Sequence, residues 1–188
     1  MEMFVSGLIM FFTLHFITAT PVLRQKFVQS VGPNVWKGLV ALGSLGGVVL
    51  ICLGWKSVPA TPLFAPSVLA IRLAPVLVSI ALILFVIGGG NLRGHIKRNL
   101  HHPMLVGAIL WSGTHLLANG GIRESILFGS FLIFSIYALW SLLRAGKRAD
   151  FEPALKWDLI GIGIGMFVAI GFMHGHAGLF GKPVVFMG

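Results

Sequence analysis

The chain contains few of the residues from which soluble domains and most cysteine-based centres are built. Charged residues make up 10% of its 188 residues, whereas about 25% is usual in a soluble domain. Hydrophobic residues make up 56%, so the composition excludes an ordinary soluble protein and favours an all-α integral membrane bundle. The only cysteine is Cys52. With only one cysteine, the chain cannot form an internal disulfide, a cysteine-rich zinc or iron–sulfur site, or a covalent c-type haem attachment.

Carboxylates are also scarce, and none lies in the middle of an apolar segment. The five are Glu2, Glu124, Asp150, Glu152 and Asp158. Proton pumps and cation-coupled transporters usually carry carboxylates near the bilayer midplane, so their absence there disfavours both classes. The net charge of +9 comes from basic residues between the apolar segments. We therefore expect these residues to face the lipid bilayer, and we expect no nucleic-acid partner.

Six apolar segments are close to the roughly 20 residues that span a bilayer. They predict transmembrane helices at about 4–20, 38–55, 68–88, 103–118, 125–143 and 155–173, in a single domain over residues 1–188. The first, third and fifth loops hold ten of the fourteen Lys and Arg residues. The positive-inside rule places these loops in the cytoplasm and both termini on the periplasmic side. Gly43 and Gly47, like Gly161 and Gly165, are four residues apart, which predicts close helix packing.

The polar groups expected inside the spans are His15, His115 and Arg72. His115 belongs to a segment that begins at Pro103 and ends at Asn119-Gly120-Gly121, a strong helix-stop signal. Trp111 and Asn119 lie four residues on either side of it, so the three share one helix face. Neutral imidazoles suit haem iron. The alternative is that each histidine forms a hydrogen bond to a neighbouring helix, and the residues themselves leave both interpretations open.

Other polar residues have weaker claims to a chemical role. His102 precedes Pro103 and either caps the fourth segment or is a solvated loop histidine. Arg72 either extends to the outer interface or pairs with a haem propionate. His174 and His176 lie just past the sixth segment. On an extended chain their spacing suits copper or zinc, although two ligands alone do not make a site.

Several stretches between about residues 3 and 143 resemble the NnrU family of bacterial membrane proteins. The most specific block runs from His102-Pro103-Met104-Leu105-Val106-Gly107 through Leu110-Trp111 to His115-Leu116-Leu117-Ala118-Asn119-Gly120. Further matches are Pro21-Val22-Leu23-Arg24, Trp36-Lys37-Gly38-Leu39 and Phe128-Gly129-Ser130-Phe131. The resemblance implies a multi-pass protein of the bacterial cytoplasmic (inner) membrane.

The resemblance also implies a cofactor. NnrU proteins are associated with denitrification, in support of nitrite and nitric oxide reductases. The family is similar to 15-cis-zeta-carotene isomerase, a membrane enzyme with b-type haem. By this resemblance His15 and His115 are axial ligands of a haem b iron. With that haem in place, we expect His102, Trp111, Asn119 and Arg72 to belong to its pocket.

Two functions follow from the resemblance, and catalytic residues stay unassigned. The first is a haem-dependent role, either redox or nitric-oxide-linked work in denitrification or the cis–trans isomerisation of a lipophilic polyene such as a carotenoid. The alternative is a cofactor-free assembly or interaction factor for a membrane or periplasmic reductase.

Overall fold

The computed structural model describes residues 1–181 and residue 184, and over these residues the chain is helical with short connections. The helices are α1 Glu2–Ala19, α2 Pro21–Val31, α3 Pro33–Gly54, the 3-10 turn η1 Trp55–Ser57, α4 Val68–Gly89, α5 His95–Leu100, α6 Pro103–Asn119, α7 Ile122–Arg144 and α8 Leu155–Phe180. The expected all-α class is confirmed for the part of the chain that the structure describes.

Helix boundaries follow local signals in the sequence. α2, α3 and α6 each begin with a proline, where the missing N–H has no intrahelical partner to lose. α6 ends at Gly120, whose φ of 71° is the left-handed conformation that glycine favours. α8 continues to Phe180, past the predicted end at residue 173. His174 and His176 therefore lie in a helix, and the expectation of an extended chain there is wrong.

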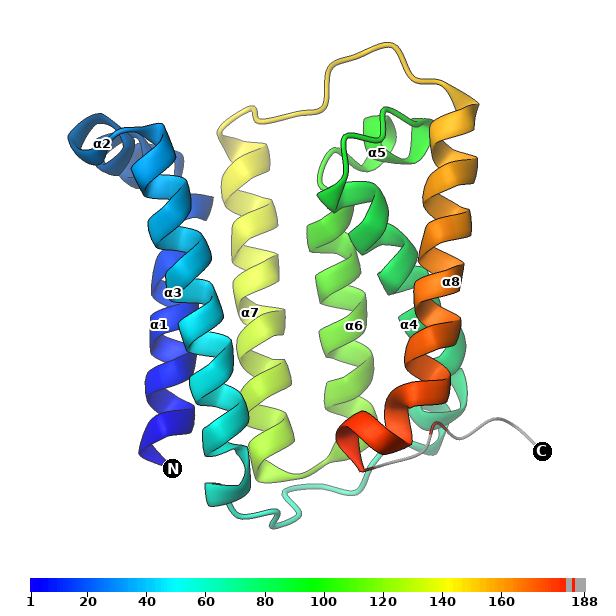
Figure 1. The fold of residues 1–188 in the computed structure, drawn as a ribbon. Helices are drawn as coiled ribbons and strands as arrows, with labels where there is room; N and C mark the ends of the chain where they lie inside the picture. Colours follow the sequence, from blue (N-terminus) through cyan, green and yellow to red (C-terminus); the bar gives the residue numbers. More distant parts are fainter. Residues whose placement is uncertain (182–183, 185–188) are drawn as a thin grey trace.

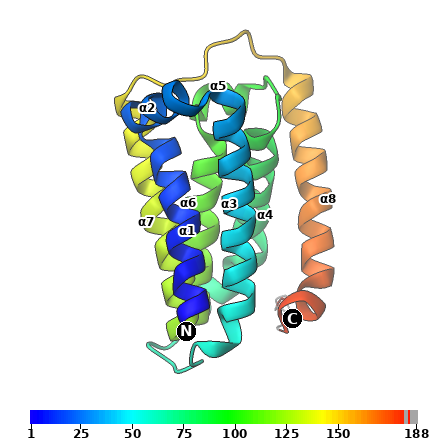
Figure 2. The ribbon, with the colours of Figure 1, turned by 60° about the vertical axis from the view of Figure 1, so that its left-hand side comes forward.

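The long helices run side by side, and α2 and α5 lie across one end of the bundle (Figures 1 and 2). α1 packs against α3, and α4 packs against both α6 and α8. α7 joins the two groups, because it packs against α6 and also contacts α1. We call the end with α2, α5 and the 145–154 connection the basic end. Met1 and the last turn of α8 lie at the opposite end (Figure 1).

Glycine allows the closest helix contacts, as its spacing predicts. Gly43 and Gly47 are buried in α3, and a Cβ on Gly47 would lie 3.0 Å from the carbonyl oxygen of Gly7 in α1. Gly161 and Gly165 of α8 face side chains of α4 in the same way. Small residues at this spacing let backbones approach where lipid provides no hydrophobic driving force.

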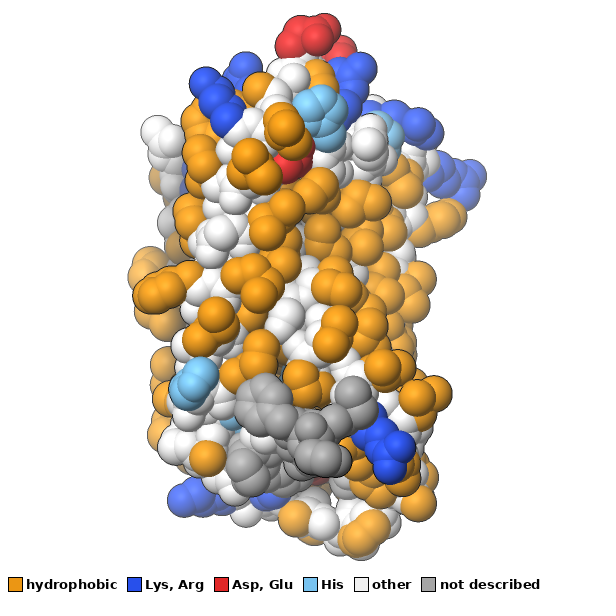
Figure 3. Space-filling view, turned by 90° about the vertical axis from the view of Figure 1, so that its right-hand side faces the viewer, with side chains coloured by type: hydrophobic (Ala, Val, Ile, Leu, Met, Phe, Trp, Pro, Cys, Tyr) orange, Lys and Arg blue, Asp and Glu red, His pale blue; other side chains and the backbone are white. Residues whose placement is uncertain are grey.

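The outside of the bundle is that of a membrane protein. Hydrophobic side chains cover the flank, and Lys and Arg side chains gather towards the two ends (Figure 3). Among the described residues, five helices are long and apolar enough to cross a membrane: α1, α3 with η1, α4, α7 and α8. α6, with 17 residues, is the shortest of the long helices. The structure therefore supports five of the six predicted spans on length and composition.

Candidate functional site

His115 lies on α6 with the two partners that its spacing predicts. Its Nδ1 is 2.9 Å from the carbonyl oxygen of Trp111, and the Asn119 side-chain amide donates to the carbonyl of His115 at 2.8 Å. A carbonyl only accepts hydrogen bonds, so Nδ1 carries the proton and Nε2 keeps its lone pair. Metal-binding histidines commonly have this arrangement, in which one ring nitrogen is fixed and the other is the ligand.

His15 on α1 repeats this local geometry. Its Nδ1 is 2.9 Å from the carbonyl oxygen of Phe11, so its Nε2 also keeps the lone pair. The imidazole stacks on the Phe11 ring, with centroids 4.0 Å apart and planes 18° apart. Both predicted ligands are therefore pinned to their own helices and are not hydrogen-bonded through Nδ1 to a neighbouring one.

A continuous set of aromatic rings connects the two histidines, and we call it the aromatic belt. Its centre is Phe131 of α7, whose ring centroid lies 5.4 Å from Phe11, 5.0 Å from Phe12 and 5.3 Å from Trp111. The full belt is Phe11, Phe12, His15, Trp111, His115, Phe128, Phe131 and Phe134. It brings α1, α6 and α7 together around one apolar surface.

The two histidines contact different parts of the belt. His15 contacts Phe134, and His115 contacts Phe128. These two phenylalanines are six residues apart on α7, which is about 9 Å along the helix axis. The shortest chain of ring contacts between the histidines passes through Phe11, Phe131 and Trp111.

This separation provides a test of whether the site fits haem. In this arrangement the donor chemistry fits a haem held by one histidine. Ligation by both would require the two histidines, whose phenylalanine contacts on α7 lie about 9 Å apart along that helix, to reach one iron.

The remaining predicted pocket residues are not brought to His115. His102 lies at the start of α6, thirteen residues from His115, which is about 19 Å along the helix. Its Nε2 is 2.5 Å from the carbonyl oxygen of Lys147 at the basic end. Arg72 is exposed near the start of α4.

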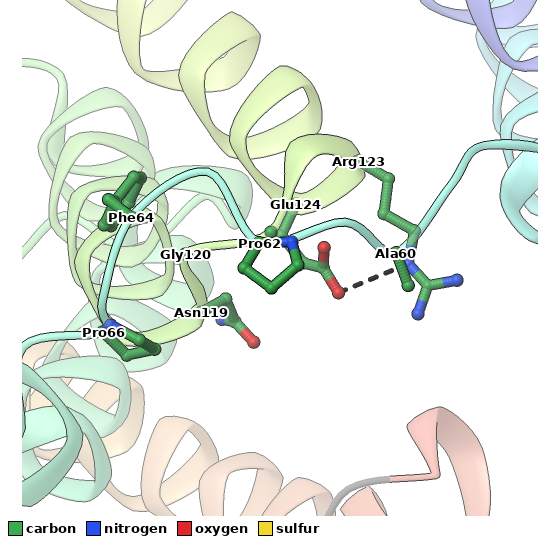
Figure 4. Close-up of a pocket in the computed structure, with 9 residues that line it drawn as sticks. Ala60, Pro62, Phe64, Pro66, Asn119, Gly120, Arg123 and Glu124 are labelled. Carbon is green, nitrogen blue, oxygen red and sulfur yellow. Dashed lines mark hydrogen bonds and ion pairs between the residues drawn. The ribbon is translucent and has the colours of Figure 1, made fainter.

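A small pocket lies next to the His115 end of the belt. Asn119 and the buried carboxylate of Glu124 approach the same space beside Pro62 (Figure 4). Glu124 pairs with Arg123 at 3.3 Å, and the Arg123 guanidinium lies 4.8 Å above the Trp55 ring. The predicted fifth span begins at about residue 125, just after Glu124. The pocket was not predicted, because the 58–67 connection that lines it carries no periodic pattern.

The aromatic belt was also missed as a unit, although the sequence holds a signal for it. Phe128, Phe131 and Phe134 are three residues apart on α7, and Phe11 lies four residues before His15 on α1. Both spacings place side chains on one helix face. Only the packing of α1, α6 and α7 shows that these faces meet. Within the described residues, no three His, Cys, Asp or Glu side chains are grouped to hold a metal ion.

These features define a helical membrane protein with two partly buried histidines set among aromatic rings. The chain belongs to the NnrU family, since the family model described as NnrU protein matches residues 3–184. No curated protein and no solved structure matches the chain. The resemblance seen over residues 3–143 is therefore confirmed, and the match extends through α8.

Proposed function

We propose that this protein is a six-span NnrU protein of the bacterial inner membrane, with both termini periplasmic, that binds b-type haem in the aromatic belt. Its task is a redox or nitric-oxide-linked step in denitrification, or the cis–trans isomerisation of a polyene. The observation that carries the proposal is the fixed tautomer of His115, whose Nδ1 is held by the Trp111 carbonyl at 2.9 Å. That tautomer leaves Nε2 for an iron.

The surroundings of His115 suit a flat apolar cofactor. Trp111 and Phe128 lie with ring centroids 5.3 and 4.7 Å from the imidazole. Aromatic rings provide large apolar contact area for a macrocycle. When bound, the haem would supply an iron that changes redox state and takes nitric oxide or donates electron density to a conjugated chain.

His15 stays the predicted second ligand, but its contribution differs from that of His115. Its ring stacks on Phe11, and it is linked to His115 through ring contacts with Phe131 and Trp111. We expect His115→Ala to abolish haem binding. We expect His15→Ala to retain haem through His115 with a changed spectrum, because the iron would lose its second imidazole.

The test is an ultraviolet–visible spectrum of the detergent-purified protein, before and after dithionite. A Soret band that shifts and sharpens on reduction is the expected result. His174→Ala is the matched control: His174 is exposed on α8, and its Nδ1 also lies 2.9 Å from a carbonyl oxygen of its own helix. This control is expected to keep the full haem content, and its helicity by circular dichroism provides the folding reference for the other variants.

A colourless preparation that stays colourless after haem is added back contradicts the proposal. That result favours the alternative, a cofactor-free assembly or interaction factor for a reductase. If haem is bound, nitric oxide added to the reduced protein and chromatography of an added polyene distinguish the two haem-dependent roles. A spectrum shifted by nitric oxide supports the first, and a changed isomer ratio supports the second.

A further inference from the structure

The short helix α2 has an unusual position for a helix of a folded bundle. None of its eleven residues is buried by the described protein, and it lies across the basic end (Figure 2). Leu23, Phe27 and Val31 are spaced by four and so share one face. Phe27 and Val31 are exposed at 41% and 37%, although the Phe27 ring also contacts Trp36.

The other face of α2 carries Gln25, Lys26 and Gln29, which are exposed, together with the exposed Val22. An apolar row opposite a mainly polar one is the pattern of a helix that lies in a membrane interface. Exposing an apolar row to water is unfavourable. At the boundary between head groups and acyl chains, the apolar row contacts the acyl chains and the polar row contacts the head groups.

The residues around α2 are mostly positively charged, and this charge determines which lipid head groups can bind there. The exposed cations of the basic end are Arg24, Lys26, Lys37, Arg93, Arg144, Lys147, Arg148 and Lys156. The carboxylates at this end are largely engaged: Asp158 is buried against α5, and Asp150 pairs with Arg98 at 3.0 Å. The basic end therefore presents a strong excess of accessible positive charge.

We infer that α2 lies in the head-group layer and that the basic end binds anionic phospholipid, such as phosphatidylglycerol. The occupant follows from charge complementarity: zwitterionic head groups leave the eight exposed cations uncompensated, whereas anionic ones neutralise them. This inference depends on insertion in a membrane and not on haem. A protein that binds no haem would therefore not contradict it.

Thermal unfolding of the full chain in mixed micelles tests the inference. Phosphatidylglycerol is expected to raise the unfolding temperature of the wild type more than phosphatidylcholine does. Arg24→Gln combined with Lys26→Gln is expected to remove about a quarter of that difference, because it removes two of the eight exposed cations. Lys56→Gln combined with Arg72→Gln removes two exposed cations at the opposite end and is expected to leave the difference unchanged.

Two results would overturn the inference in this experiment. One is an equal effect of the two lipids on the wild type. The other is an equal loss in both double variants, which would show a response to net charge and not to this surface.

The position of α2 has an independent test that needs no loss of charge. In a Cys52→Ser background, an environment-sensitive fluorophore is attached at Val31→Cys or at Gln29→Cys, and the protein is reconstituted in phosphatidylglycerol vesicles. Blue-shifted emission at position 31 relative to position 29 is expected. Equal, water-like emission at both positions contradicts an interfacial α2.

Discussion

At the scale of single residues, the contact between α1 and α3 depends on the absence of a side chain at Gly7. A Cβ there would lie 2.7 Å from both the carbonyl oxygen of Gly47 and the backbone nitrogen of Ile51. Neither atom belongs to a flexible side chain, so the two helices would have to move apart. In lipid, close backbone packing is a main source of helix association.

Gly7→Ala is therefore expected to lower the free energy of unfolding by about 1–3 kcal/mol, the usual cost of overpacking. Thermal unfolding in detergent measures the effect. Gly38→Ala is the matched control, because a Cβ at Gly38 of α3 has no atom within 4 Å; it is expected to be neutral or slightly stabilising. Equal stability of the two variants would contradict the close contact.

At the scale of elements, the six-residue helix α5 is held by a side chain from another helix. The carboxylate of Asp158 in α8 accepts the backbone N–H groups of His95 at 2.7 Å and Ile96 at 3.0 Å. It also lies 3.0 Å from Nδ1 of His95. A helix this short is not stable alone, and Asp158 binds the N–H groups that begin it.

Asp158→Asn removes the charge from these hydrogen bonds, so we expect a loss of about 1–3 kcal/mol and a loosened α5. Limited trypsin digestion at Lys97 and Arg98 is expected to become faster. Glu152→Gln is the control, since Glu152 is an exposed carboxylate six residues away. Unchanged digestion of the Asp158 variant would show that α5 is held by other contacts.

The elements also show what the sequence can predict and where prediction stops. Apolar segment length, initial prolines and the Asn119-Gly120 stop predict most helices, because these signals are local. The His115 face with Trp111 and Asn119 follows from spacing within one helix. The aromatic belt and the Asp158 cap involve residues on different helices, and no local pattern states which helices meet. The helical continuation of α8 past residue 173 was missed because glycine and histidine interrupt its apolar run.

At the scale of the whole molecule, the distribution of charge follows the order of the loops. Ten of the fourteen Lys and Arg residues lie in or beside the three connections at the basic end, where Figure 1 places α2, α5 and the 145–154 connection together. This agreement is expected if successive spans cross the membrane in alternating directions. The proposed six-span topology also requires α6 to cross the membrane, although α6 is shorter than the other long helices.

Cysteine accessibility tests the orientation and the span of α6 together. In a Cys52→Ser background, Thr61→Cys lies before α4 and Ala145→Cys lies after α7, and both positions are exposed. Three long helices (α4, α6 and α7) and the short α5 separate them, so a six-span topology places them on opposite sides. A membrane-impermeant maleimide is expected to label position 61 in intact spheroplasts and position 145 only after permeabilisation, because positive loops stay cytoplasmic. The reverse pattern would invert the orientation, and labelling of both positions from one side would remove α6 from the spans.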